Sequence, residues 1–273
     1  MLRQCLPEFP KCFSILRIAE YLPAGKCLDP RIAPAAFMLE SYVSMNESVL
    51  LLASASPRRR ELLSLFDLPF STGAANLDET PIRGEYPLEY VRRLAESKGR
   101  ALVGCHSATV LSADTVVVLD GQVLGKPSDD EEARQMLITL RGREHTVYTA
   151  IALQNPDRNL SLSDLCRTIV PMRAYSAAEM EAYIASGDYR DKAGGYAIQH
   201  KSFHPACWVE GCYANVMGLP LCHVYRSLLL AGITVDRDIP SACQNALGIT
   251  CTVFPELLNQ DVDITRTTGI VEN

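Results

Sequence analysis

The sequence has few lysines, no long apolar run and no closely spaced pair of cysteines. Its 273 residues include six lysines against 20 arginines. No apolar stretch approaches the ~18–20 residues that cross a bilayer, so we expect no integral membrane protein. The net charge of −6 argues against a protein that coats nucleic acid, although it leaves room for a basic pocket. The glycine, proline and hydrophobic contents are ordinary, which excludes collagen-like, low-complexity and wholly disordered chains.

The ten cysteines include no Cys-x-x-Cys pair. A secreted disulfide scaffold would be shorter and denser in cysteine, so we expect reduced, buried thiols in a cytoplasmic protein. His200, His204, Cys207 and Cys212 could in principle supply four zinc ligands, but their spacing matches no common zinc module and Pro205 interrupts them. We favour a turn between strands at this place.

The two ends of the chain differ from its middle. Residues 1–44 hold five prolines and three cysteines without a sustained helix or strand period, and they show no secretory signal. Because Met45 directly precedes the first expected strand, we favour Met45 as the true initiator and residues 1–44 as an upstream translation or an unimportant N-terminal extension outside the domain. Residues 234–273 are weakly patterned and are predicted to be a loosely docked C-terminal tail.

The pattern of residues 45–233 is that of an α/β domain. The strands expected from short apolar or valine-rich runs are 49–53, 109–119, 146–153, 164–175, 196–199 and 208–216, with a hairpin at 120–121. The expected helices are 58–66, 86–102, 128–140, 176–186 and 219–230, with Ser128 and the pair Ser176 and Glu179 as N-terminal caps. Strands and helices do not alternate strictly. We therefore predict a mixed central β-sheet with flanking helices.

Residues 54–60, Ser-Ala-Ser-Pro-Arg-Arg-Arg, lie between a predicted strand and a predicted helix. Such turns expose backbone N–H groups, and the helix dipole favours an anion there. The hydroxyls of Ser54 and Ser56 and the guanidinium groups of Arg58 and Arg59 add donors for phosphate oxygens. We favour phosphate binding over a merely solvated run of arginines.

Three of the six lysines, Lys98, Lys126 and Lys192, stand in tight local settings beside glycine, proline or acidic residues. With 20 arginines and only six lysines, the chain prefers arginine wherever any cation will serve. A retained lysine therefore suggests a specific task, such as placing a point charge on a phosphate.

Asp114 falls midway in an apolar strand, where an unpaired carboxylate would be costly. A buried acid of this kind is usually paired, metal-bound or catalytic. Glu79, in a predicted loop, can join it around a divalent cation, because Mg²⁺ is normally held by one or two carboxylates plus substrate phosphates. Taken alone, Glu79 is better explained as an exposed loop residue.

Together these segments resemble the Maf family of nucleoside triphosphate pyrophosphatases, relatives of the inosine-triphosphatase-like enzymes. The resemblance covers about 190 residues, 49–230, and is carried by seven motifs in the family's order. They are Ala53-Ser54-Ala55-Ser56-Pro57-Arg58-Arg59, Asp78-Glu79-Thr80, Arg93-Leu94-Ala95-Glu96-Ser97-Lys98, Ser112-Ala113-Asp114-Thr115-Val116, Gly125-Lys126-Pro127, Asp191-Lys192-Ala193-Gly194-Gly195-Tyr196-Ala197-Ile198-Gln199 and Gly218-Leu219-Pro220-Leu221.

The resemblance implies an active site in a cleft, where a nucleoside triphosphate is hydrolysed to the monophosphate and pyrophosphate with Mg²⁺ or Mn²⁺ as cofactor. Asp114 falls on the family's proton-acceptor position. The residues on its polar active-site positions are Glu79, Lys98, Lys126 and Lys192, with Glu79 and Asp114 as the expected metal ligands.

The resemblance also suggests a base. Arg58, Thr115 and Gln199 match the branch that acts on dTTP and UTP, whereas the branch resembling the 7-methyl-GTP enzymes has Trp, Gln and Glu at these positions. A Gln amide is both donor and acceptor, as the O4/N3–H edge of uracil or thymine requires. The chain departs from the family at His200, where the family usually has Gly, and a side chain there is expected to reshape the base pocket.

We therefore expect a house-cleaning enzyme whose lysines and Arg58 neutralise developing charge while Asp114 activates a water at the α-phosphate. Two alternatives stay open: a pyrophosphatase for another base, such as 7-methyl-GTP or a modified pyrimidine, and a non-catalytic nucleotide-binding regulator of cell division. The presence of both Asp114 and Glu79 favours the enzyme. The sequence leaves open whether the chain forms a homodimer.

Overall fold

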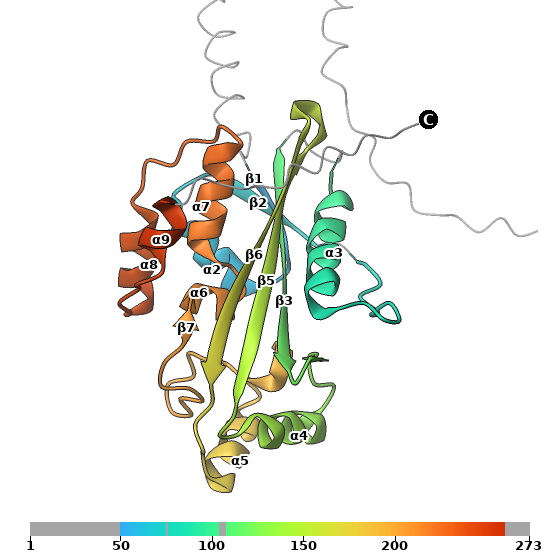
Figure 1. Cartoon of the computed structure of the whole chain (residues 1–273), viewed down its shortest axis with the longest axis vertical. Coiled ribbons are helices and arrows are strands. Elements are labelled where there is room, and N and C mark those ends of the chain that lie inside the picture. Colours follow the sequence, from blue (N-terminus) through green and yellow to red (C-terminus); the bar gives the residue numbers. More distant parts are fainter. Residues whose placement is uncertain (1–49, 75, 104–107, 260–273) are drawn as a thin grey trace, which may run out of the picture. The chain divides into compact units, whose positions relative to one another are not determined.

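One mixed β-sheet organises the computed structural model, which describes residues 50–74, 76–103 and 108–259 (Figure 1). Within them seven strands run in the order β2-β1-β3-β5-β6-β7, with β4 paired to β3. Their bounds are β1 Leu50–Ala53, β2 Phe70–Gly73, β3 Thr109–Leu119, β4 Gln122–Leu124, β5 Glu144–Asn155, β6 Leu160–Pro171 and β7 Glu210–Gly211. β1 is parallel to β2 and β3, and the other pairs are antiparallel. The predicted mixed sheet is confirmed.

Helices cover the sheet from two sides (Figure 1). α3 packs against β3 and β5, whereas α6 and α7 pack against β5 and β6. Because side chains alternate along a strand, Val116 of β3 packs with Val91 of α3, while its neighbour Val117 belongs to the larger core with Val224 of α7. The helices are α2 Pro57–Ser64, α3 Pro87–Arg100, α4 Asp130–Leu140, α5 Ala177–Ser186, α6 Tyr213–Val216, α7 Leu221–Leu230, α8 Ile239–Leu247 and α9 Phe254–Asn259, with 3₁₀ turns η3 Pro156–Arg158 and η4 Ala193–Gly195.

Capping residues fix where the helices begin. Ser176 and Glu179 form the predicted capping box of α5. At α4 the cap lies one residue later than predicted: the Asp129 carboxylate accepts from the Glu132 N–H at 2.8 Å. The Ser128 hydroxyl instead donates to the Glu132 carboxylate at 2.7 Å.

Two predicted strands are wrong. Residues 196–199 follow η4 in irregular conformation, although Tyr196 and Ile198 are buried, because these side chains reach the core without joining a strand ladder. In 208–216 only Glu210–Gly211 pairs with β6, after which α6 begins. In both segments the apolar residues are spaced as in a buried strand, although most of them lie outside any strand.

The predicted loose tail is also wrong for residues 234–259, which contain α8 and α9. Both helices pack against α7. Ile239 is completely buried and shares the main core with Val235 and Cys243. Asp238 caps α8 by accepting the Ser241 N–H at 3.1 Å. The predictions for residues 1–44, Met45, Val49 and 260–273 fall outside the described residues.

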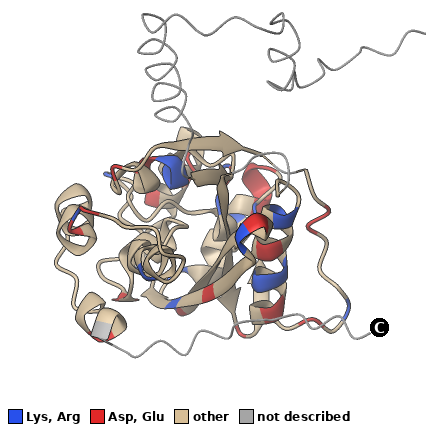
Figure 2. Cartoon of the chain, turned by 90° about the horizontal axis from the view of Figure 1, so that it is seen from above, with Lys and Arg blue, Asp and Glu red and all other residues tan. Residues whose placement is uncertain are grey.

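Charged residues of both signs occur along the helices (Figure 2). Helix α3 carries both acidic and basic residues, and Glu96 and Arg100 form an ion pair at 3.2 Å, four residues apart. Among the helices that the structure describes, none is long and apolar enough to cross a membrane.

Candidate active site

A gap along one edge of β3 creates the candidate site. β1 pairs with β3 as far as Ser112, and β4 pairs with β3 only from Val117 onward. Among the described strands, none therefore covers that edge of residues 113–116, while β5 covers the other edge. Asp114 and Thr115 leave the strand toward opposite faces, and both line a cleft of about 330 Å³.

The cleft gathers residues from widely separated segments of the chain. Of the eleven site residues predicted from the sequence, ten line it: Ser56, Arg58, Arg59, Glu79, Lys98, Asp114, Thr115, Lys126, Lys192 and Gln199. The eleventh, Ser54, is buried behind it at the end of β1. Its hydroxyl accepts the Ser56 N–H at 3.2 Å and thereby shapes the turn into α2.

Lys98, near the end of α3, stands between the two predicted metal ligands. Its Nζ lies 2.5 Å from Oδ1 of Asp114 and 2.8 Å from Oε1 of Glu79. The loop that carries Glu79 is tied to α3, because the Tyr90 hydroxyl donates to the Glu79 carbonyl at 2.8 Å. Arg93 holds the same loop through Glu85 at 2.6 Å. Both carboxylates are thus positioned by one helix.

The surroundings shift the pKa values of the two acids in opposite directions. Burial raises the pKa of Asp114, and the nearby charges of Lys98 and Arg59 offset this only in part. Partial burial also raises the pKa of Glu79, but the hydrogen bond and charge of Lys98 outweigh it and leave this pKa below its usual value. Asp114 therefore holds a proton more readily than an ordinary aspartate, while Glu79 stays ionised.

The carboxylate pair fits a divalent cation bound together with substrate. Since Oδ1 of Asp114 and Oε1 of Glu79 both contact the Lys98 nitrogen, both can face one cation. In the described ranges no group of three or more His, Cys, Asp or Glu side chains could form a complete metal cage. Two carboxylates completed by phosphate oxygens and water are a usual environment for Mg²⁺.

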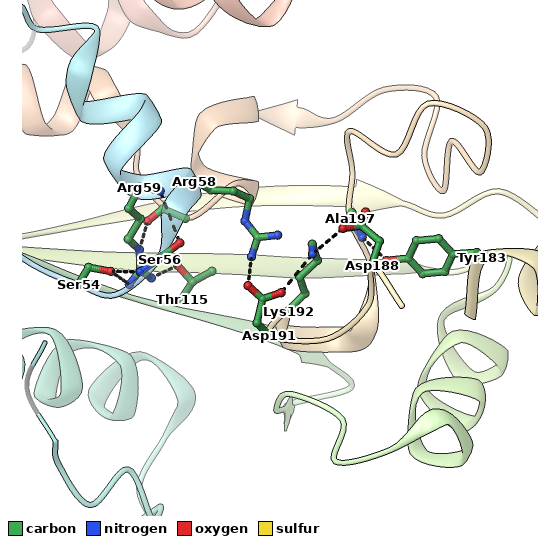
Figure 3. Close-up of polar contacts among 11 residues, drawn as sticks. Ser54, Ser56, Arg58, Arg59, Thr115, Tyr183, Asp188, Asp191, Lys192 and Ala197 are labelled. Carbon is green, nitrogen blue, oxygen red and sulfur yellow. Dashed lines mark hydrogen bonds and ion pairs between the residues drawn. The ribbon is translucent and has the colours of Figure 1, made fainter. Parts of the chain in front are cut away.

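The two arginines of the α2 turn have different surroundings (Figure 3). The Arg59 guanidinium group is hydrogen-bonded within the protein: its Nε donates to the Gly218 carbonyl at 2.7 Å and its Nη2 to the Thr115 hydroxyl at 2.9 Å. Gly218 has φ 100°, and a Cβ there would lie 3.3 Å from Arg59 Nε, so this close approach requires glycine. Among the described residues, Arg58 makes only a long ion pair, 3.9 Å, with Asp191.

Asp191 links Arg58 to Lys192 in the same view (Figure 3). Lys192 Nζ lies 3.2 Å from Asp191 and 3.0 Å from Asp188. Lys126 is exposed and lines the cleft, and its charge contributes to the lowered pKa of Glu79. Besides Lys98 and Arg59, the cleft therefore carries three cationic side chains near the carboxylate pair: Arg58, Lys126 and Lys192.

Gln199 lies on a segment that Tyr183 of α5 holds in place. The Ala197 N–H donates to the Tyr183 hydroxyl at 2.8 Å (Figure 3), and the Gln199 side chain is exposed at the cleft. The expectation that His200 reshapes the base pocket stays a prediction. The His200 Nδ1 accepts the Phe203 N–H at 3.0 Å and its ring packs edge-on against Tyr183, outside the cleft lining.

Sequence reasoning missed the residues behind the cleft wall. Thr149 on β5 lies opposite Thr115, with 2.9 Å between the two hydroxyl oxygens, and it donates to the Asn215 carbonyl at 3.0 Å. Tyr90 and Tyr183 were also missed. The neighbours of Thr149 and Asn215 follow from strand register and helix packing, so no local pattern could have indicated them. For Tyr90 and Tyr183 the one available signal is that a buried tyrosine hydroxyl needs a hydrogen-bond partner.

Comparisons with known proteins support one family. The profile described as "Maf-like protein" matches residues 49–230. A dTTP/UTP pyrophosphatase of Myxococcus xanthus is 46% identical over 192 residues, which cover 70% of this chain and 96% of that protein. The protein of the same name from Moorella thermoacetica is 44% identical, covering 69% and 97%, and that from Yersinia pestis is 47% identical, covering 70% and 96%.

Similarity to solved structures is weaker. A HAM1 protein of Coxiella burnetii is 17% identical with a TM-score of 0.33, covering 46% of this chain and 73% of its own. A nucleoside-triphosphatase, dITP/XTP pyrophosphatase, of Mycobacterium abscessus is 14% identical with a TM-score of 0.35, covering 67% and 97%. At these scores the likenesses add nothing to the assignment. The matched profile and the relatives above 40% identity, spanned almost in full, show that this chain belongs to the Maf family.

Proposed function

We propose that this chain is a nucleoside triphosphate diphosphatase, which hydrolyses dTTP and UTP to the monophosphate and pyrophosphate. One observation carries the proposal: a buried carboxylate and a second acid share one lysine in a cleft lined by four further cationic side chains. Such a site suits a polyanion that must be attacked by water. The names of the curated relatives supply the substrates.

The cationic side chains would bind and orient the triphosphate. Arg58 and Lys192 are held by carboxylates of the protein, so phosphate oxygens can replace Asp191 between them. Their charges favour the bound trianion and the charge that develops on the leaving pyrophosphate. The turn at Ser56 adds the N-terminal end of α2, whose helix dipole favours an anion.

Asp114 would act as the base. A water oxygen attacks the α-phosphorus, its proton passes to the Asp114 carboxylate, and the bond between the α-phosphorus and the bridging oxygen breaks to release pyrophosphate. Burial raises the pKa of Asp114, which brings its basicity closer to the working pH than that of an exposed aspartate. Lys98 holds the carboxylate in place through the contact at 2.5 Å.

We also propose Mg²⁺ or Mn²⁺ as cofactor, with Glu79 and Asp114 as its protein ligands. When bound with substrate, such an ion would neutralise phosphate charge and polarise the phosphorus centre. The contacts of both carboxylates with the Lys98 ammonium group support this shared cation site.

Gln199 and Thr115 would read the base. The Gln199 amide can donate to O4 of uracil or thymine, and it is exposed in the cleft. We place the reaction in the cytoplasm as a house-cleaning activity that extends to modified pyrimidine nucleotides. The described cysteines support a reducing compartment, since all of them are free thiols: Cys166, Cys207, Cys212, Cys222, Cys243 and Cys251.

A nucleotide panel tests the proposal. Pyrophosphate release is measured for dTTP, UTP, CTP, GTP and 7-methyl-GTP with Mg²⁺, with Asp114→Asn in parallel to exclude a contaminating enzyme. We expect kcat/KM for dTTP and UTP to exceed the other values about tenfold or more, the discrimination that one matched hydrogen bond provides. Highest activity on 7-methyl-GTP would contradict the base assignment, and no pyrophosphate from any nucleotide would contradict the reaction.

A further inference from the structure

A line of hydrogen bonds runs from the cleft through the sheet to α6. The Arg59 Nη2 donates to the Thr115 hydroxyl at 2.9 Å, that hydroxyl contacts the Thr149 hydroxyl at 2.9 Å, and the Thr149 hydroxyl donates to the Asn215 carbonyl at 3.0 Å. Thr115 and Thr149 lie directly opposite each other on β3 and β5.

The direction of every proton in this line is determined. A carbonyl oxygen only accepts, so the single proton of Thr149 is used on Asn215. The proton between the two threonines must therefore belong to Thr115. Because an arginine N–H only donates, Thr115 also accepts from Arg59. One lone pair of Thr115 is left for the cleft, and no proton.

The far end of the line is rigid. Thr149 and Asn215 are completely buried. The Asn215 Nδ2 donates to the Val147 carbonyl at 3.0 Å and to the Thr168 hydroxyl at 2.9 Å. These bonds fix Asn215 in α6, and with it the carbonyl that accepts from Thr149. Arg59 is fixed at the other end by the Gly218 carbonyl at 2.7 Å. The Thr115 hydroxyl is therefore held at both sides.

We propose that Thr149, anchored on the Asn215 carbonyl, is a positioning residue that makes Thr115 an acceptor toward the nucleotide and so selects bases with an N3–H. This inference rests on the proposed function and adds a selection rule to it. Uracil and thymine carry a proton on N3, which Thr115 can accept. Cytosine presents a bare N3 lone pair, which would face the lone pair of Thr115 without a proton between them.

Substitution of Thr149 tests the rule. Thr149→Val keeps the shape of the side chain but removes its hydroxyl, which releases the Thr115 proton to point into the cleft. We expect the ratio of kcat/KM for UTP to that for CTP to fall about tenfold, the effect of reversing one hydrogen bond. Thr149→Ser restores the hydroxyl and should restore the ratio. Thr149→Ala serves in place of Thr149→Val if the latter does not fold.

Thr109→Val is the matched control. Thr109 is a buried threonine on the same strand as Thr115, it accepts from Asn155 at 3.2 Å, and it does not line the cleft. A merely structural loss at Thr149 would lower activity on both nucleotides equally, as this control would. An unchanged ratio in Thr149→Val, in an enzyme that prefers UTP, would overturn the inference and leave the proposed function standing.

Binding supplies a second readout that does not need turnover. UTP and CTP affinities are measured by calorimetry in the Asp114→Asn background, with and without Thr149→Val. The same tenfold fall in preference is expected. If the wild-type chain neither hydrolyses nor binds UTP in preference to CTP, the proposed base specificity fails and the inference fails with it.

Discussion

Lys98 Nζ lies 2.5 Å from Oδ1 of Asp114, so a fixed positive charge stands beside the proposed base. The position of this charge has a consequence for the pH dependence. Lys98 lowers the pKa of Asp114 against the rise caused by burial. The proposed mechanism needs the Asp114 carboxylate, so activity should be lost as the pH falls through that pKa.

Lys98→Gln should therefore move the acid limb of the kcat/KM profile to higher pH, because the pKa of Asp114 rises once the lysine charge is gone. The measurement is kcat/KM for dTTP across pH 4 to 9. Lys126→Gln is the matched control: it removes another cleft cation, which acts on Glu79, and should lower the rate while leaving the acid limb in place. If the acid limb of the Lys98→Gln profile lies at the same pH as in the wild type, Lys98 does not control the ionisation of Asp114.

Asp114→Asn is nearly isosteric but cannot accept a proton. We expect kcat to fall on the order of 100-fold or more, the scale of losing a general base, with an unchanged circular dichroism spectrum. Turnover close to wild type in the folded variant would remove Asp114 from the mechanism.

Arg58 and Arg59 should respond differently to the same substitution. Arg58→Gln should raise KM about tenfold at nearly unchanged stability, because within the described part of the chain Arg58 has only a 3.9 Å ion pair to lose. Arg59→Gln should lower the free energy of unfolding by about 2 kcal/mol, because it leaves the Gly218 carbonyl and the Thr115 hydroxyl without their donor. Thermal unfolding and KM for dTTP, measured on both variants, check this; equal effects would refute the distinction.

Gln199→Glu replaces the amide donor by a group that only accepts. The O4 atom of UTP or dTTP would then face a negative charge, so kcat/KM for these nucleotides should fall about 10- to 100-fold. Activity on GTP should fall less or rise, since guanine N1–H and N2–H gain an acceptor. The ratio between nucleotides is the readout, because a carboxylate also repels every triphosphate. An equal loss on all nucleotides would mean that Gln199 does not read the base.

His145 should make stability depend on pH. Burial lowers its pKa to about 4, and its Nε2 contacts the Tyr196 hydroxyl at 2.7 Å. The unfolded chain binds a proton below about pH 6.5 whereas the folded chain does not, so stability falls as the pH drops from 6.5 toward 4. At pH 5 this histidine should cost about 2 kcal/mol relative to pH 8.

Urea unfolding at pH 8 and pH 5 measures that difference. His145→Gln should reduce the loss of stability between the two pH values by about 2 kcal/mol, while His204→Gln, at an exposed histidine, should leave it unchanged. The same loss in His145→Gln as in the wild type would show that other groups cause it.

Local patterns predicted the long central strands of the sheet and much of the cleft, but they missed β2. The valine-rich run at Thr109–Leu119 and the turn at Gly121 fixed β3 and its hairpin with β4. A strand followed by Ser56-Pro57 predicted the turn into α2, because both capping and the proline preference act within a few residues. A charged residue inside an apolar strand marked Asp114.

Features that depend on distant residues were not predictable. Thr149 meets Thr115 only through the register of β3 and β5, and Asn215 only through the packing of α6. Helix α8 has nine residues and derives its buried face from α7, so its pattern alone was too short to distinguish from a tail. The segment 196–199 hides its apolar side chains without strand pairing.

The position of water attack tests the central claim most directly. dTTP is hydrolysed by the wild-type chain with Mg²⁺ in ¹⁸O-labelled water, and the products are analysed by mass spectrometry. Attack by an Asp114-activated water at the α-phosphorus predicts dTMP carrying one ¹⁸O atom and unlabelled pyrophosphate. Label in the pyrophosphate, or release of inorganic phosphate and dTDP, would contradict the mechanism.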